Sequence, residues 1–361
     1  MKYPIYKIEI TELEKRNVND CLESTWISSH GKYINRFEQM LSDYCSTKYV
    51  TSVINGTAAL HLVMLAANIG PGDEVIVPDF SYIATANAVL YVGATPIFID
   101  VDIDTWNIDS KSLLKKITKK TKAIIAVDIF GNPANYDCLI NICRQYKLLL
   151  ISDSAEAFGA EYKNKKCGNL ADISIFSFFG NKTITTGEGG AILTNEKKLF
   201  EYIKKLKNQG NSPQKKYYHD ILGYNFRMTN IQAAIGCAQL ERCEDILNQK
   251  NKIADTYKKY LSKHLVFQYI SSKAKSSYWM VSGLLSDKEK RDSIIKYLSK
   301  LGIDTRPFFY PMHTMPYFNI VLNNPTTQML SERGLCLPSY PSLKEKDIQF
   351  ISKEIINFLE D

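Results

Sequence analysis

Short runs of valine, isoleucine and leucine alternate with segments of helical period through the first half of the chain. The runs predict strands at 49–54, 74–78, 95–101, 123–130 and 148–153, and the segments between them predict helices at 57–68, 82–91, 109–118 and 136–146. Strands separated by helices are typical of parallel sheets that are covered on both faces. The pattern therefore predicts an α/β fold with a mainly parallel sheet, which strands near 173–179 and 189–194 would complete.

The two ends of the chain follow a different pattern. Amphipathic helices are predicted at 12–24 and 33–44, and after the sheet come a helix at 196–208 and a long helix from Asn230 into the 260s. The remainder predicts a mixture of strands and helices, at 278–285, 287–301, near 303–309, 335–337 and 344–359. We expect a large α/β domain at 25–245 and a smaller α+β domain formed by 1–24 and 246–361, bridged by the long helix.

One lysine lies where the last part of the sheet is expected to end. The run from Ser174 to Phe179 is apolar, stops at Gly-Asn-Lys182, and continues as a glycine-rich turn to Gly190. At the end of a buried strand the Lys182 ammonium would lose water, which favours a neutral amine able to form a Schiff base with a carbonyl carbon. A surface lysine is the alternative if Lys182 is considered alone. The residues that accompany it therefore decide between a surface lysine and a reactive one.

Two upstream segments contain residues that would accompany Lys182 in a site. Asp153 ends the strand at 148–153, on the edge where open α/β sheets bind ligands, although it could instead cap a following helix. Asn55, Gly56 and Thr57 lie between a strand and an alanine-rich helix, where free amides and the helix dipole bind phosphate. A phosphate cradle, an acid for a ring nitrogen and a Schiff-base lysine together predict a site for pyridoxal 5′-phosphate.

Six runs spread over nearly the whole chain carry a resemblance to a known family. They lie at 24–29, 55–62, 72–78, 177–190, 218–230 and 306–316, and Ser-Phe-Phe-Gly-Asn-Lys-Thr at 177–183 is the most specific. In them the chain resembles the aminotransferases of nucleotide-linked keto-sugars, which have the type I aspartate-aminotransferase fold. The resemblance implies amino transfer from L-glutamate to a keto-sugar nucleotide, with GDP-4-keto-6-deoxymannose as the expected acceptor, in a homodimer with shared active sites.

The resemblance also implies roles for residues around the coenzyme. Lys182 would form the Schiff base and then carry the proton to and from the substrate carbon, and Asp153 would keep the ring nitrogen protonated. Phosphate contacts and ring stacking would come from Gly56, Thr57, Ser177, Tyr82 and, from the other subunit, Asn225. An ordinary turn, a strand serine, a core aromatic and a loop asparagine are the alternatives for these residues.

Arg306, Tyr310 and His313 lie in a proline-rich stretch that the resemblance assigns to the substrate mouth, although His313 could equally be a buried or loop histidine. Two features depart from the family. Glu156 stands where many relatives have a glutamine beside the coenzyme's phenolic oxygen, so its pKa must be raised or its carboxylate must turn away. The segment 275–279 lacks a Phe-His pair, which leaves open another nucleotide-linked keto-sugar or a small phosphorylated ketone.

Composition narrows the function classes. The net charge of +7 is spread over short lysine patches without aromatic interleaving, so nucleic acid is not an expected partner. No apolar run reaches membrane-spanning length and no signal-like segment follows Met1, so we expect a cytoplasmic protein. The eight cysteines lack paired-ligand spacing, so we expect free thiols and no metal site. A non-catalytic regulator that keeps the fold is the alternative from another class, but it would be expected to lose Lys182 or Asp153.

Overall fold

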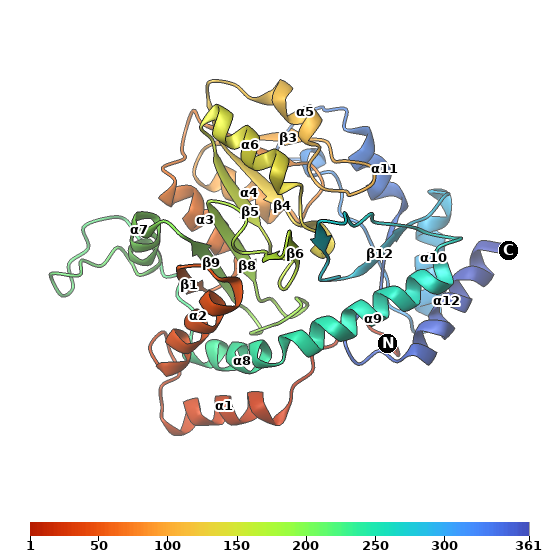
Figure 1. Cartoon of the computed structure of the whole chain (residues 1–361), viewed down its shortest axis with the longest axis horizontal. Coiled ribbons are helices and arrows are strands. Elements are labelled where there is room, and N and C mark those ends of the chain that lie inside the picture. Colours follow the sequence, from red (N-terminus) through yellow and green to blue (C-terminus); the bar gives the residue numbers. More distant parts are fainter. Residues whose placement is uncertain (361) are drawn as a thin grey trace.

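The computed structural model describes residues 1–360, and a seven-stranded sheet forms its centre (Figure 1). The strands lie in the order β1-β9-β8-β5-β4-β2-β3. Their bounds are Tyr49–Val53 for β1, Glu74–Pro78 for β2, Thr95–Ile99 for β3, Thr121–Val127 for β4, Leu149–Asp153 for β5, Ile173–Ser177 for β8 and Gly190–Thr194 for β9. All neighbouring pairs are parallel except those that β9 makes with β1 and β8. The predicted mainly parallel α/β sheet is confirmed.

Alternate residues along the central strands enter two different cores. Ile76 and Ile124 belong to one hydrophobic cluster, whereas Val75, Val77 and Ile125 belong to another. Because successive strand side chains point to opposite faces, both faces of the sheet are buried. The covering helices include α2 (Lys32–Cys45), α3 (Gly56–Ala66), α4 (Ala84–Tyr91), α6 (Tyr136–Tyr146) and α7 (Lys197–Lys207), and α1 (Glu12–Glu23) packs on α8 (Asn230–Glu241).

The expected single long helix after Asn230 is wrong in one respect. It is two helices, α8 and α9 (Cys243–Leu261), which are separated at Arg242 and run along one side of the molecule in Figure 1. Arg242 leaves helical geometry with φ −114°, and its guanidinium reaches α1, where Nε lies 3.2 Å from a Glu14 carboxylate oxygen. A contact with another helix therefore marks the break.

A second sheet lies at the other end of α9. It has the order β10-β12-β14-β13, with β10 at Val266–Phe267, β12 at Val281–Leu284, β13 at Arg306–Pro307 and β14 at Gly334–Leu337. The helices α10 (Glu289–Lys300) and α12 (Glu345–Glu360) accompany it. A third hydrophobic cluster joins Tyr3 to side chains between 253 and 355. The division into domains at 24/25 and 245/246 stays a prediction.

Several local expectations need correction. Helix α11 (Pro325–Arg333) was not expected. Its N-terminal amides at Thr326 and Thr327 bond to the side chain of Asp100, and a cap so distant in sequence gives no local signal for the start of a helix. The helix expected at 109–118 is a short α5 (Ser110–Leu113) followed by a 3₁₀ turn at Leu114–Lys116. The strand expected to reach 130 stops at Val127, because Phe130 adopts a left-handed φ of 54°.

A small third sheet completes the description of the strands. It has the order β11-β6-β7, with β6 at Glu161–Tyr162, β7 at Lys165–Lys166 and β11 at Ala274–Lys275. It fixes the segment before Trp279 against the chain that follows β5. Within residues 1–360, no helix combines the length and the apolar character that crossing a bilayer would require.

Candidate active site

The carboxyl ends of three strands bring the predicted site residues to one edge of the large sheet. β5 ends at Asp153 and β8 ends at Ser177. β1 is antiparallel to β9, which is antiparallel to β8, so β1 and β8 run in the same direction and both pair their last residue with Gly190. The turn after β1 and the turn after β8 therefore lie together, at the edge where α/β sheets bind ligands.

Lys182 lies on a tight turn directly after β8. Its amide donates to the Phe179 carbonyl over 2.9 Å, and Thr186 closes the loop back onto Phe178. The side chain is 12% exposed, with Nζ 3.8 Å from Glu156 Oε1. Burial lowers the pKa of Lys182, while the carboxylates of Glu156 and Asp153 oppose that shift. The expected desolvation of Lys182 is present, and it favours a neutral, nucleophilic amine.

Asp153 is buried and held by a hydroxyl group. Its Oδ2 accepts a hydrogen bond from Thr85 Oγ1 at 2.7 Å, and its Oδ1 accepts one from the Ala155 amide at 3.2 Å. No helix follows it in the described segment 154–160, so the helix-cap alternative is wrong. Burial raises the pKa of Asp153, and the neighbouring Lys182 partly offsets this. Sequence reasoning missed Thr85, although Tyr82, three residues before it, was a candidate.

The turn that carries Tyr82 is tied to Asp153 through Thr85. The Thr85 amide donates to the Tyr82 carbonyl over 3.3 Å. The Tyr82 side chain is 59% exposed, and its ring centroid lies 6.2 Å from that of Phe309. Tyr82 is thus available for stacking rather than part of the core, and its stacking on a coenzyme ring stays a prediction.

The predicted phosphate cradle has the required shape. Helix α3 begins at Gly56, and the Asn55 side chain caps it by accepting from the Ala58 amide at 2.8 Å. A Cβ on Gly56 would stand 2.9 Å from Ser177 Cβ, so only glycine lets the helix end approach β8 this closely. The first turn of α3 has no acidic residue, and its first amides lack partners within the helix. Gly56, Thr57 and Ser177 therefore fit a phosphate group.

Glu156 resolves one of the two alternatives left by the sequence. Its carboxylate does not turn away: Oε2 accepts from the Phe130 amide at 2.9 Å while Oε1 faces Lys182. The left-handed φ of Phe130 places that amide here. Burial raises the pKa of Glu156 to about 7, and the charge of Lys182 opposes the rise. A carboxyl group that is protonated near neutral pH is compatible with a neighbouring phenolic oxygen.

Trp279 was not predicted as a site residue, yet its ring covers the amine of Lys182. Lys182 Nζ lies 4.1 Å from the Trp279 ring centroid, and the indole Nε1 donates to the Asn181 carbonyl over 2.7 Å. Asn181 Oδ1 is buried beside Lys182 without a hydrogen-bond partner in the described chain. An unpartnered polar atom, a bare helix end and a buried acid together indicate a site built around a polar group, and these residues fit pyridoxal 5′-phosphate.

The residues predicted for the substrate mouth differ in exposure. Arg306 is exposed, with its guanidinium 6.0 Å from the Tyr6 ring centroid, and Tyr310 is 61% exposed. His313 is buried, and its amide and ring Nδ1 both bond to the Asp79 carboxylate. Asp79 also accepts from Asn324 Nδ2 at 2.9 Å. His313 thus has a structural partner, and substrate contact by these residues stays a prediction.

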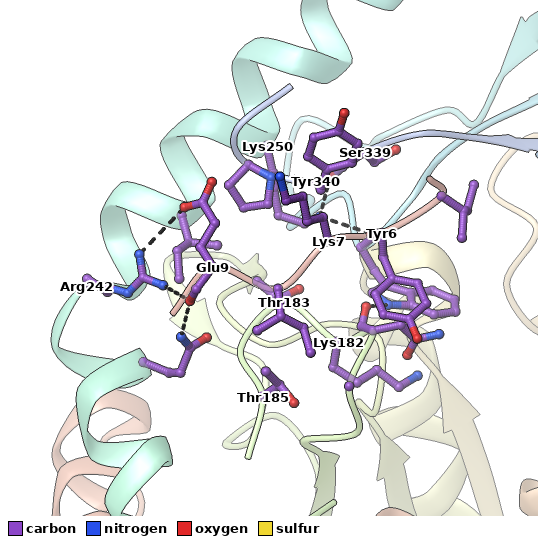
Figure 2. A pocket seen from close by; sticks show the side chains of 18 residues that line it. Tyr6, Lys7, Glu9, Lys182, Thr183, Thr185, Arg242, Lys250, Ser339 and Tyr340 are labelled. Carbon is purple, nitrogen blue, oxygen red and sulfur yellow. Dashed lines mark hydrogen bonds and ion pairs between the residues drawn. The ribbon is translucent and has the colours of Figure 1, made fainter. Parts of the chain in front are cut away.

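Asn225 lies on an exposed loop. Its Oδ1 accepts from Arg227 Nε at 3.1 Å and from Nη2 at 2.8 Å. The carbonyl of the adjacent Phe226 accepts from the Ile54 amide at 2.9 Å, directly before the turn at Asn55. The Asn225 loop of this chain therefore runs past the base of α3, and its reach toward a second subunit stays a prediction. Figure 2 shows a pocket that Lys182, Thr183, Lys250 and Ser339 all line, with Lys7 drawn between the two pairs.

Comparisons with known proteins agree with this geometry. Residues 8–356 match the DegT/DnrJ/EryC1/StrS aminotransferase family. A GDP-perosamine synthase from Escherichia coli O157:H7 is 47% identical, with 100% of both chains covered, and one from Vibrio cholerae is 41% identical, with 98% of both covered. A structure of a putative sugar aminotransferase from Streptococcus pneumoniae, in its PLP form, has a TM-score of 0.94 at 29% identity. The match covers 99% of this chain and 98% of that one.

Proposed function

This chain belongs to the DegT/DnrJ/EryC1/StrS family of pyridoxal phosphate-dependent aminotransferases, and from that premise we propose that it converts GDP-4-keto-6-deoxymannose to GDP-perosamine with L-glutamate as amino donor. Support comes from relatives that are named GDP-perosamine synthase and that align over nearly the full chain. The observation that carries the chemistry is the buried Lys182 amine, which lies 3.8 Å from the Glu156 carboxyl group and is influenced by the charge of Asp153.

In this proposal the coenzyme and the side chains of Asp153, Lys182 and Glu156 have separate roles. When bound, the coenzyme supplies an aldehyde for covalent capture of amines and an electron sink for proton removal. Asp153, held by Thr85, keeps a proton on the ring nitrogen. Lys182 Nζ takes a proton from the donor carbon and delivers one to the acceptor carbon, and its lowered pKa suits both steps. Glu156, with a pKa of about 7, holds a hydrogen near the phenolic oxygen.

The proposal includes a homodimer in which Asn225 contacts the phosphate bound by the other subunit. An Asn225→Asp substitution then places a carboxylate against that phosphate and weakens coenzyme binding. Mixing Asn225→Asp with Lys182→Ala under subunit exchange should restore activity, because one site of each mixed dimer carries neither change. Verified mixed dimers that stay inactive, with both parents folded, would mean that Asn225 acts within its own subunit.

The proposal also includes a cytoplasmic location. All eight cysteines are free and seven of them are buried. Free thiols persist in reducing compartments, whereas oxidising compartments favour disulfides. Fractionation of the source cells with a disulfide-bonded periplasmic or secreted marker would test this part separately.

The segment 275–279 favours a second candidate acceptor. Lys275 is exposed and paired with Glu161 at 2.7 Å, and Ser276 and Ser277 are small and buried. Bulkier aromatic and imidazole groups would change the volume of this segment next to Trp279. Another nucleotide-linked keto-sugar, or a small phosphorylated ketone, is therefore the alternative acceptor for the same amino transfer.

The deciding experiment presents a panel of ketones to the enzyme in its amino-loaded form. The panel contains GDP-4-keto-6-deoxymannose, UDP-linked keto-sugars and small keto-phosphates, with GDP-mannose as the control that lacks a ketone. Return of the aldehyde-form absorbance and the mass of the product report transfer. The proposal requires the GDP-linked ketone to react with the highest kcat/KM. A higher kcat/KM for a UDP-linked sugar or a small ketone would replace the acceptor but keep the reaction.

A further inference from the structure

A second buried lysine lies close to the site but outside its chemistry. Lys250 belongs to α9, and its ammonium donates to the carbonyl oxygens of Trp279 at 3.1 Å and Ser339 at 2.8 Å. Figure 2 shows it beside Ser339 and Tyr340, across the pocket from Lys182. Among residues 1–360, no carboxylate forms an ion pair with Lys250. Two neutral carbonyls are thus the partners that the structure gives this charge.

Burying the charge of Lys250 in this way lowers the stability of the fold. Burial lowers the pKa of Lys250 to about 8, which reports the loss of hydration that the carbonyls do not fully replace. An apolar side chain of the same length would avoid the cost of burying the charge, but it would leave the Trp279 and Ser339 carbonyls without this donor, at about 1–3 kcal/mol for each buried group left unpaired. These two effects oppose each other, so stability alone does not explain a lysine at position 250.

The carbonyl that Lys250 binds belongs to the residue covering the reactive amine. Trp279 is fixed at three points of its own: the amide donates to Phe130 O at 3.2 Å, the carbonyl accepts from Lys250, and the indole donates to Asn181 O. Asn181 directly precedes Lys182. The Trp279 ring consequently connects the α9 ammonium to the turn that carries the Schiff-base lysine.

The second carbonyl, that of Ser339, connects Lys250 to the four-stranded sheet. Ser339 follows β14, and its hydroxyl accepts from the Val281 amide at 2.8 Å at the start of β12. Lys250 thereby joins α9, the entry to β12 and the exit from β14 at one point.

We propose that Lys250 is a positioning residue, which holds the Trp279 indole against Lys182 by binding the Trp279 and Ser339 carbonyls. The inference rests on Lys182 as the reacting amine but not on the identity of the sugar acceptor. Lys250 takes no part in proton transfer itself. Its removal should loosen the geometry of the Lys182 turn while the fold persists.

The test compares Lys250→Met with Lys252→Met, the same substitution at an exposed position of the same helix. Methionine keeps the length of the side chain and removes the donors. We expect kcat to fall about 10- to 100-fold in Lys250→Met, the size produced by small misplacements of reacting groups, with KM changed less than about 3-fold. Its Tm should change by no more than about 5 °C, because the loss of two carbonyl hydrogen bonds opposes the relief of removing a buried charge. Lys252→Met should match the wild type in every respect.

A measurement without coenzyme separates positioning from activity. Reductive methylation with formaldehyde across a pH series, with the Lys182 peptide followed by mass spectrometry, gives the midpoint pH for reaction of that amine. Displacement of the indole admits water to Lys182, so the midpoint in Lys250→Met should rise by at least about 0.5 pH unit. This shift is expected even if the proposed sugar acceptor is wrong.

A double-mutant cycle shows whether Lys250 acts through Trp279. In a Trp279→Leu background the ring is already absent, so Lys250→Met should move the Lys182 midpoint by less than about 0.2 pH unit. An equal shift in both backgrounds would overturn the proposal, as would an unchanged midpoint and kcat in Lys250→Met. If Lys250→Met does not fold, Lys250→Gln, whose shorter side chain cannot span both carbonyls, is subject to the same expectations.

Discussion

Asp153 and Asp79 are buried carboxylates at the ends of two strands of the same sheet, β5 and β2, and they differ in how completely they are paired. Asp79 follows β2 and accepts hydrogen bonds from the His313 amide, the His313 ring and Asn324. Asp153 ends β5 and has one hydroxyl and one amide as donors, while the amine that attracts it is itself buried. The first arrangement fastens a loop. The second leaves the Asp153 carboxylate able to take a further partner, such as the ring nitrogen of the proposed coenzyme, and this incomplete pairing separates the two acids.

Lys182→Ala gives the largest expected effect and tests the proposed role of Lys182 directly. The change removes the amine that is proposed to form the Schiff base and to carry the proton, so turnover should fall by more than about 10⁴-fold. The phosphate cradle at Gly56 is untouched, so coenzyme should still bind, although borohydride should no longer attach it to the chain. Steady-state assays and mass spectrometry measure the two effects. Appreciable turnover by this variant would refute the assignment of Lys182.

Asp153→Asn should cause the second-largest loss of turnover. The amide keeps the shape but cannot stabilise a protonated ring nitrogen as a carboxylate does, so the rate should drop at least about 100-fold. Thr85→Val is the matched partner change, because it removes the hydroxyl that orients Asp153 and should cause a smaller loss in the same direction. A near-normal rate for Asp153→Asn, measured at saturating coenzyme, would leave Asp153 with a structural role only.

The sequence predicted the sheet edge well because its signals are local. Apolar runs end in Asp153 and Ser177, and both faces of the sheet are apolar, so the strand ends could be located without knowledge of the packing. The run at 177–183 then singled out Lys182 among many lysines as the candidate for the Schiff base, and this role stays a prediction. The family, the α/β fold and the coenzyme dependence predicted from these residues are confirmed.

The residues that sequence reasoning missed depend on contacts between distant segments. Thr85 matters because it meets Asp153, Trp279 because it covers Lys182, and α11 begins where Asp100 caps it from afar. One signal for Lys250 was available. It lies on the apolar stripe of α9 with Ile246 and Ile253, where a lysine is unexpected.

Glu156→Gln should change how the free energy of unfolding depends on pH, which adds a third buried carboxyl group to the comparison of Asp153 with Asp79. A folded pKa of about 7 against an ordinary 4.5 means that the folded chain holds more protons than the unfolded chain between these values. Glu156 therefore contributes stability that is complete below about pH 4.5 and is lost as pH rises through about 7, by up to about 3 kcal/mol. Denaturation of coenzyme-free protein at several pH values should show this slope in the wild type and a reduced slope in Glu156→Gln.

The same variant has a second consequence at Lys182. The Glu156 carboxylate raises the pKa of Lys182 against the effect of burial, so its removal should lower that pKa further. Methylation of Lys182 in the coenzyme-free protein should accordingly reach its midpoint at lower pH in Glu156→Gln. A midpoint that moves upward, or a wild-type stability slope that survives the substitution unchanged, would contradict the placement of Glu156 beside the amine.

Asp79→Asn should have the smallest effect on chemistry and decides whether the two carboxylates really differ. An amide offers one acceptor atom where three donors converge, so one donor loses its partner at a cost of about 1–3 kcal/mol in the free energy of unfolding. Because the loop with Tyr310 loosens while the sheet edge is unchanged, kcat should stay within about 3-fold and KM for the sugar should rise. Thermal denaturation and steady-state kinetics measure both. If kcat instead fell as far as in Asp153→Asn, with the protein folded, the well-paired carboxylate would be part of the reactive machinery and the contrast between the two strand ends would fail.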